Sequence, residues 1–325
     1  MKIIAIEEHF LTKAVSNEWK KYSDKDDPTI HLHLGEIENR LEEIGNLRLQ
    51  LMDETGIDVQ ALSLTSPSLH NLGSESVGLA IQTNDFLAEI VSTKPDRFQG
   101  FAALPMPEPK EAVKELERSV KKLGLKGVML CGRTREKNLD HKDFWDLFEL
   151  AEALRVPLFI HPQIPQKAVR DIYYSGFDWQ TDLAFSTFGL GWHYEAGIQF
   201  VRLVLAKVFD RFPNLQVILG HWGEVILFYT ERLASLNRVT KLGRPFIEYL
   251  RNNLYVTASG MFSHAYLQRS IEIIGTDRIL FSTDYPYQYR PGRQARSFLE
   301  SIRLSDEDKE KFAFANWEKL TDQKL

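Results

Sequence analysis

Cysteine is almost absent from this chain of 325 residues, which contains only Cys131. One thiol cannot form an intramolecular disulfide, and it cannot build a cysteine-based zinc site. A tightly bound metal ion would therefore need His, Asp and Glu as its ligands.

Long apolar runs are also missing. The N-terminus offers four apolar residues, Ile3 to Ile6, before two acids, which is far short of a signal-peptide core. No apolar run approaches the eighteen residues of a membrane-spanning helix. We therefore expect a cytoplasmic protein that is not bound to a membrane.

Positive charge is not in excess. Lys and Arg total 40 and Asp and Glu total 45, a net charge of −5, which gives no general field favouring nucleic acid. A G-x-G-x-x-G motif after the first strand and a Walker motif are both lacking, so nucleotide-binding versions of a doubly wound sheet have no support. The remaining composition, 43% hydrophobic and 26% charged, is that of an ordinary globular protein.

Eight short segments are apolar almost continuously, as strands buried on both faces of a parallel sheet must be. They are IIAIEEH from Ile3, VQALSLT from Val59, FQGFAAL from Phe98, KGVMLCG from Lys126, VPLFIH from Val156, LQVILGH from Leu215, LYVTAS from Leu254 and RILFSTD from Arg278.

Segments with helical periodicity lie between these strands, for example from Val77 and from Pro109, and Ser305 is a plausible N-cap near the end of the chain. No composition break marks a linker. The pattern predicts an α/β fold with a single (β/α)8 TIM barrel as one domain over residues 1–325, and a doubly wound open sheet is the structural alternative.

Two connections are unusually long. About thirty-five residues, rich in aromatics, separate the fifth strand from a helix expected to begin near Gly197, and the connection from Phe10 to about Leu34 is similar. Such loops usually cover a site or make a subunit contact. We therefore expect long active-site loops.

Metal-ligating and proton-transferring side chains end four of the strands. Glu7 and His9 share one face of the first strand, because alternate residues of a strand point the same way. The fifth strand ends in His161, the sixth in His221 and the eighth in Asp284. Because barrel enzymes place their reactive groups at the carboxyl ends of the strands, these residues predict a site for a divalent ion such as zinc or manganese.

The same motifs resemble the amidohydrolase superfamily. They are E-x-H on the first strand, H-P after the fifth, L-G-H-W-G-E after the sixth and F-S-T-D-Y-P after the eighth. More narrowly, E-x-H resembles the metal-dependent decarboxylase branch, which includes γ-resorcylate and 2,3-dihydroxybenzoate decarboxylases and is related to aminocarboxymuconate semialdehyde decarboxylase. Hydrolases of the superfamily typically carry H-x-H at this position.

The resemblance implies a mononuclear site in which Glu7, His9, His161 and Asp284 ligate one divalent ion, Zn²⁺ or Mn²⁺. It implies decarboxylation of a hydroxylated aromatic acid, with Asp284 as proton donor and His221 exchanging the proton with it. Glu224 would orient the His221 imidazole, although an ordinary acid at a helix start is the alternative. The family also implies a homodimer or homotetramer.

Two further residues are candidate substrate contacts. Arg232, expected two turns into the helix that follows His221, would pair with the substrate carboxylate or reach a neighbouring subunit; an exposed structural arginine is the alternative. Cys131 stands where γ-resorcylate decarboxylases tend to have Asn, which puts 2,6-dihydroxybenzoate itself in doubt as the substrate, and a small buried residue is the alternative.

The other histidines are expected to lie outside the site. Loop, surface or non-strand-end positions are predicted for His31, His33, His70, His141, His193 and His264.

Two other functions remain open. A hydrolase of a lactone or amide would use the same metal to activate water, with Asp284 as general base. A non-catalytic barrel is the third hypothesis, and the complete set of metal-type residues argues against it.

Overall fold

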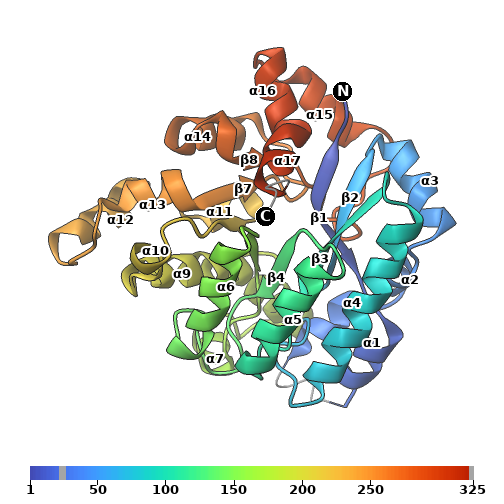
Figure 1. Cartoon of the computed structure of the whole chain (residues 1–325), viewed down its shortest axis with the longest axis horizontal. Coiled ribbons are helices and arrows are strands. Elements are labelled where there is room, and N and C mark those ends of the chain that lie inside the picture. The colour runs from blue at the N-terminus through green and yellow to red at the C-terminus, as the bar shows by residue number, and fades with distance from the viewer. Residues whose placement is uncertain (22–26, 322–325) are drawn as a thin grey trace.

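Eight parallel strands form a closed barrel at the centre of the molecule, with helices around it (Figure 1). The computed structural model describes residues 1–21 and 27–321. The strands are β1 (Ile4–Phe10), β2 (Val59–Leu64), β3 (Phe98–Ala103), β4 (Gly127–Cys131), β5 (Leu158–His161), β6 (Val217–Leu219), β7 (Leu254–Thr257) and β8 (Ile279–Leu280).

Neighbouring strands pair in chain order from β1 to β8. The barrel closes where the Ile6 N–H donates to Phe281 O at 3.0 Å and the His9 N–H donates to Tyr285 O at 2.7 Å. The predicted (β/α)8 barrel is therefore confirmed, and the open doubly wound sheet is wrong.

The α-helices lie mostly outside the strands. They are α1 (Lys13–Trp19), α2 (Glu36–Glu42), α3 (Asn46–Thr55), α4 (Ser76–Thr93), α5 (Pro109–Lys121), α6 (Trp145–Ala153), α7 (Lys167–Tyr173), α8 (Trp179–Ser186), α9 (Gly191–Leu205), α10 (Val208–Arg211), α11 (His221–Glu224), α12 (Thr230–Ala234), α13 (Phe246–Asn253), α14 (His264–Ile274), α15 (Gln294–Ser301), α16 (Asp306–Glu310) and α17 (Asn316–Thr321).

Short segments of other helical types complete the described chain. They are η1 (Pro28–His33), η2 (Lys142–Phe144), η3 (Ser235–Arg238), η4 (Thr276–Arg278) and the π-helical turn η5 (Lys311–Ala315). Within residues 1–21 and 27–321, no helix is both long enough and apolar enough to cross a membrane.

Two apolar layers hold the barrel. The larger layer lies between the strands and the surrounding helices. A smaller cluster combines apolar residues from all eight strands with two residues of α17: Ile4, Ile6, Val59, Ala61, Phe101, Met129, Phe159, Ile218, Tyr255, Leu280, Trp317 and Leu320. It fills the barrel interior, as side-chain layers do in this fold, so the polar groups gather at the strands' carboxyl ends.

The two long connections contain helices that hydrophobic periodicity did not reveal. The connection after β5 carries α7 and α8, and α9 begins at Gly191, six residues before the predicted start near Gly197. The first connection carries α1 and η1. The Ser305 cap is confirmed, because its side chain accepts a hydrogen bond from the Asp308 N–H.

Candidate active site

Three buried side chains from β1 and β5 converge at the carboxyl end of the barrel. Glu7, His9 and His161 each offer one ligand atom, and these atoms lie within 4.8 Å of one another. His161 Nε2 is 4.0 Å from Glu7 Oε1. The two imidazole rings meet edge to face, with centroids 4.9 Å apart. The structure thus brings these three predicted metal ligands together.

A β-bulge in β1 gives Glu7 and His9 their direction. Ala5 pairs with Gln60 and Glu8 with Leu62, so two residues of β1, Ile6 and Glu7, lie opposite one residue of β2. Ile4 and Ile6 both belong to the interior cluster, and strict alternation from them would turn Glu8 inward. The bulge restores Glu7 and His9 to the barrel mouth, a common use of bulges beside active sites.

Hydrogen bonds at Nδ1 orient both imidazoles toward the cluster. His161 Nδ1 donates to Pro162 O at 2.8 Å, and His9 Nδ1 bonds Ser63 Oγ at 3.1 Å. The Nε2 atom of each ring is left to face Glu7 or Asp284. Partners of this kind fix the tautomer of metal-ligating histidines.

Hydrogen bonds hold the Glu7 carboxylate through only one of its two oxygens. Its Oε2 accepts hydrogen bonds from the hydroxyls of Ser259, Thr257 and Ser282. Its Oε1 is buried and has no hydrogen-bond partner in the described part of the chain. Gly220 leaves room for this carboxylate, because a Cβ there would stand 2.9 Å from Oε1.

Asp284 reaches the cluster from the segment after β8. Its Oδ1 lies 3.4 Å from His9 Nε2, and the residue is buried. Its backbone has φ 58°, a left-handed conformation that Asp tolerates better than most residues. Burial raises the pKa of the Asp284 carboxyl to about 7, against the opposing effect of His221.

The donor set fits a divalent cation. Glu7 Oε1 and His9 Nε2 are buried polar atoms without a hydrogen-bond partner among the described residues, and both lie in the same group of ligand atoms. Burial lowers the pKa of His9 to about 3, so its imidazole is neutral at pH 7 and can ligate. Burial also raises the pKa of Glu7 to about 8, and a bound cation would favour its charged form. Nitrogen and oxygen ligands of this kind suit zinc or manganese.

His221 and Glu224 lie on a turn of unusual conformation. The five residues from His221 to Val225 all have positive φ, between 47° and 89°, and only one of them, Gly223, is a glycine. Left-handed backbone costs about 1–2 kcal/mol for each residue other than glycine. The predicted single helix that follows His221, with Arg232 two turns into it, is therefore wrong: α11 is a left-handed turn, and α12 is a separate helix that begins at Thr230.

This turn places the two side chains against each other. His221 Nδ1 donates to Glu224 Oε1 at 2.6 Å, which leaves the other ring nitrogen free of Glu224. Burial alone would lower the pKa of His221, but the carboxylates of Glu224, Glu7 and Asp284 outweigh it and raise the pKa to about 10. Burial alone would raise the pKa of Glu224, but His221 and His193 lower it to about 2.

His193 completes this group and was not predicted to do so. Its Nδ1 lies 2.8 Å from Glu224 Oε2, and its ring centroid is 4.6 Å from that of His221. It lies near the start of α9, far from any strand end. No feature of the sequence indicated its position.

A second set of residues that the sequence did not indicate forms a wall beside His9. Tyr287, three residues after Asp284, has its ring centroid 5.7 Å from that of His9. Its hydroxyl bonds Thr65 Oγ1 and His33 Nδ1, each at 2.6 Å. The loop position predicted for His33 did not indicate that its side chain is buried and bonds Tyr287.

The two candidate substrate contacts lie in different surroundings. Cys131 is fully buried, and burial raises the pKa of its thiol to about 12. Its N–H donates to His70 Nε2 at 3.2 Å. His70 lies in the loop between β2 and α4, as one of its two predicted positions has it, but it is buried, so a surface position is wrong. Arg232 is exposed on α12, and within residues 1–21 and 27–321 no ion pair joins it to the cluster.

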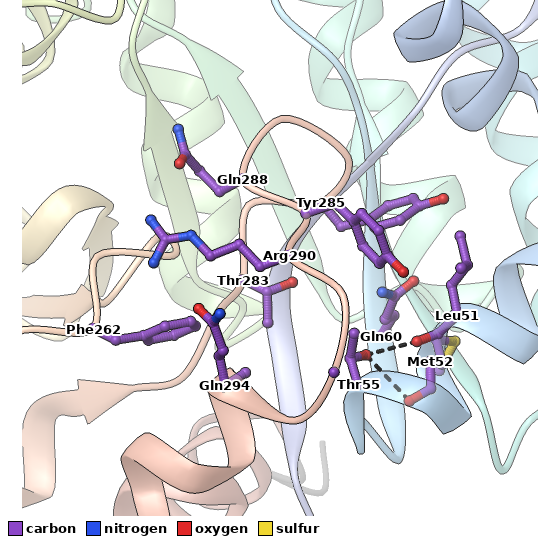
Figure 2. Close-up of a pocket in the computed structure, with 13 residues that line it drawn as sticks. Leu51, Met52, Thr55, Gln60, Phe262, Thr283, Tyr285, Gln288, Arg290 and Gln294 are labelled. Carbon is purple, nitrogen blue, oxygen red and sulfur yellow. Dashed lines mark hydrogen bonds between the residues drawn. The ribbon is translucent and has the colours of Figure 1, made fainter.

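A separate small cavity lies outside the barrel wall, between α3 and the segment from Thr283 to Gln294 (Figure 2). It is about 20 Å³, and no His, Asp or Glu is among its described lining residues. Gln60 and Thr283 line it and also donate to Glu8, which points away from the metal cluster as predicted. This cavity is not the reaction site.

Comparison with known proteins agrees with this geometry. The amidohydrolase family model matches residues 29–320. The γ-resorcylate decarboxylase of Polaromonas sp. strain JS666 is 35% identical over 332 residues, covering 98% of this chain and 97% of that protein.

Solved structures show the same likeness. The dihydroxybenzoic acid decarboxylase from Polaromonas sp. JS666, with bound manganese and the inhibitor 2-nitroresorcinol, has TM-score 0.85 and 32% identity, covering 99% of this chain and 97% of that one. The 5-carboxyvanillate decarboxylase from Novosphingobium aromaticivorans, complexed with manganese, has TM-score 0.91 and 28% identity, covering 99% and 96% of the two chains.

Proposed function

The chain belongs to the amidohydrolase family, and we propose that it is a metal-dependent, non-oxidative decarboxylase of a hydroxylated aromatic acid resembling dihydroxybenzoate. The observation that carries this proposal is the buried cluster of Glu7, His9 and His161, with Asp284 Oδ1 3.4 Å from His9 Nε2. The activities of the relatives support it, since they are carboxy-lyases acting on aromatic acids.

The reaction needs a proton at the ring carbon that bears the carboxylate. A new C–H bond forms there and aromaticity is lost; the C–C bond to the carboxylate then breaks, its electron pair restores the ring, and carbon dioxide leaves. Asp284 is the proposed proton donor, because it is a buried acid at the cluster, with Oδ1 3.4 Å from His9 Nε2. Burial raises the pKa of its carboxyl, which favours the protonated form, and a bound cation opposes this effect.

One divalent ion, Zn²⁺ or Mn²⁺, is assigned to Glu7, His9, His161 and Asp284. When bound, it supplies positive charge that orients and stabilises the substrate oxygens. Three hydroxyls, those of Ser259, Thr257 and Ser282, bond Oε2 of Glu7. Oε1 is therefore already oriented to bind the ion.

His221 is proposed to exchange the proton with Asp284 between turnovers. Its Nδ1 is hydrogen-bonded to Glu224, so Nε2 is the ring nitrogen available for proton transfer. Glu224 fixes the tautomer and stabilises positive charge on the ring, as carboxylates do for histidines that carry protons.

The substrate contacts of Cys131 and Arg232 remain predictions. Burial of the neutral Cys131 thiol is consistent with a small packing residue at the end of β4. The exposed position of Arg232 on α12 suits a role at a neighbouring subunit better than one at its own metal cluster.

Assembly and location form a further part of the proposal. We place the protein in the cytoplasm as one barrel domain that forms a homodimer or homotetramer. Its scarcity of cysteine supports the location. Exposed apolar residues on the connection after β5 support assembly, including Ile172, Tyr173, Phe177, Trp179 and Phe188.

An ultraviolet assay with Mn²⁺-loaded enzyme tests the function. The panel should hold 2,6- and 2,3-dihydroxybenzoate, 5-carboxyvanillate and conjugated acids, with lactones and esters alongside and a chelated control. We expect metal-dependent loss of an aromatic acid with release of carbon dioxide. Turnover of lactones or esters alone would overturn the proposal in favour of a hydrolase.

A further inference from the structure

The Glu224 carboxylate is held between two imidazoles. His221 bonds Oε1 at 2.6 Å, and His193 bonds Oε2 at 2.8 Å. Glu224 is fully buried, and both histidines are mostly buried. Two ligand atoms on one tetrahedral zinc ion would stand about 3.3 Å apart. The observed separations are shorter and are those of hydrogen bonds.

Counting donors and acceptors assigns the protons of His193. Its Nε2 lies 3.1 Å from Phe188 O, and a carbonyl only accepts, so Nε2 carries a hydrogen. Its Nδ1 faces an ionised carboxylate, which also only accepts, so Nδ1 carries a hydrogen too. His193 makes both bonds only as an imidazolium. A cation is thereby placed beside Glu224, on the side opposite His221.

Helix α9 approaches the left-handed turn with the face that carries His193. Gly197 follows His193 by four residues and so lies one helical turn further along the same face of α9. A Cβ at Gly197 would stand only 2.5 Å from Glu224 O. Contact at both positions shows that α9 presses directly on the left-handed turn that carries His221 and Glu224.

We propose that His193 is a positioning residue for the proton-transfer pair. It clamps the second oxygen of Glu224, so that the carboxylate cannot rotate away from His221, and it stabilises a strained turn that α9 supports. Through Phe188 O it also ties the aromatic-rich connection after β5 to this pair. The kinetic part of this inference rests on the proposed decarboxylase function; the assignment of the protons does not.

Two substitutions and a matched control test the clamp. His193→Leu removes both hydrogen bonds, His193→Gln keeps one amide donor, and His141→Gln makes the same change at an exposed histidine of the loop before η2. The assay uses Mn²⁺-loaded enzyme with 2,6-dihydroxybenzoate, or with another panel acid that is turned over faster. Folded fraction and the Kd for Mn²⁺ are measured for every variant.

We expect His193→Leu to lower kcat about tenfold to a hundredfold, as loss of an orienting partner does, with KM and the Mn²⁺ Kd nearly unchanged. His193→Gln should recover part of kcat, and His141→Gln should match the unsubstituted enzyme. Unchanged kcat in His193→Leu would overturn the inference. So would a loss of kcat that only follows a fall in folded fraction or in Mn²⁺ affinity.

A second measurement does not depend on activity. Nitrogen-15 NMR of the histidine rings at pH 7, assigned with the variants, should show His193 protonated on both nitrogens. The His221 Nδ1 signal should move in His193→Leu. A neutral His193, or a His221 ring indifferent to the substitution, would overturn the clamp. If no panel acid is turned over, the proposed function fails and this measurement still decides the inference.

Discussion

Gly220→Ala should disrupt the metal cluster without replacing any of the proposed ligands. The Gly220 backbone has φ −70° and ψ −174°, which alanine adopts without strain, so the effect comes only from space. The added Cβ would stand 2.9 Å from Glu7 Oε1 and 2.8 Å from Ser259 Oγ. Ordinary van der Waals contact begins near 3.4 Å, so the Glu7 carboxylate must move by about half an ångström.

The neighbouring side chains cannot easily shift to accommodate this displacement of the Glu7 carboxylate. Ser259 Oγ already donates to Glu7 Oε2 and accepts from the His221 N–H, so moving either side chain disturbs the other. Metal–ligand distances hold to about 0.2 Å, less than the required shift. We therefore expect the Kd for Mn²⁺ to rise about tenfold to a hundredfold, as it does when a ligand loses its orientation. This equals about 1.4–2.8 kcal/mol.

Calorimetric titration of Mn²⁺ into chelator-stripped protein measures this change. Gly78→Ala is the matched control, because a Cβ there meets nothing within 4 Å and the residue lies inside α4. It should leave the Kd for Mn²⁺ unchanged and stabilise the helix by up to about 1 kcal/mol. A Gly220→Ala protein that folds and binds Mn²⁺ as tightly as the original would refute Glu7 as a ligand at this position.

Four more outcomes are expected. Asp284→Asn should lower kcat by about 10²–10⁴-fold while the protein stays folded by circular dichroism, and retained activity would remove it as proton donor. Glu224→Gln should lower kcat with little change in the Mn²⁺ Kd measured by titration, because its oxygens bond histidines outside the metal cluster; a large loss of Mn²⁺ affinity would contradict this. Mn²⁺ at a hundred times its Kd should add about 2.7 kcal/mol to the stability of chelated protein, seen as a higher Tm, and no shift would revive a non-catalytic barrel. Cys131 should react with a thiol reagent only after denaturation, because it is fully buried with a pKa of about 12, and rapid labelling of folded protein would show that the end of β4 opens.

The barrel could be predicted because its signal is local and repeated. Each strand is buried on both faces, so its sequence is apolar throughout and is readable without knowledge of its neighbours. The segments starting at Ile3, Val59 and Leu254 correspond to β1, β2 and β7 within a few residues. The helices of the long connections gave a weaker signal: α7 buries no residue, and α8 has no single apolar face.

The candidate site was predictable at strand ends and not elsewhere. His161 is the last residue of β5 and Asp284 lies four residues after the end of β8, and parallel strands deliver their carboxyl ends to one edge. His193 belongs to a helix whose approach to Glu224 depends on the packing of α9, which no local pattern encodes. The inward direction of Glu7 was predicted from simple alternation, but in the structure it depends on the bulge at Ile6 and Glu7.

The site is built where the backbone departs from regular structure. The bulge in β1 turns Glu7 and His9 toward the barrel mouth, and the left-handed turn after β6 sets His221 and Glu224 side by side.

Four of the five turn residues are not glycine, so the conformation of this turn costs a free energy of about 4–8 kcal/mol relative to ordinary backbone. Such a conformation persists only where surrounding contacts over-determine it. Here the contacts are the hydrogen bonds from the His221 N–H to Ser259, from Trp222 Nε1 to Met261 O and between His193 and Glu224. Because the turn is held by the segment after β7 on one side and by α9 on the other, weakening either support should release the same strain and disturb the same histidine.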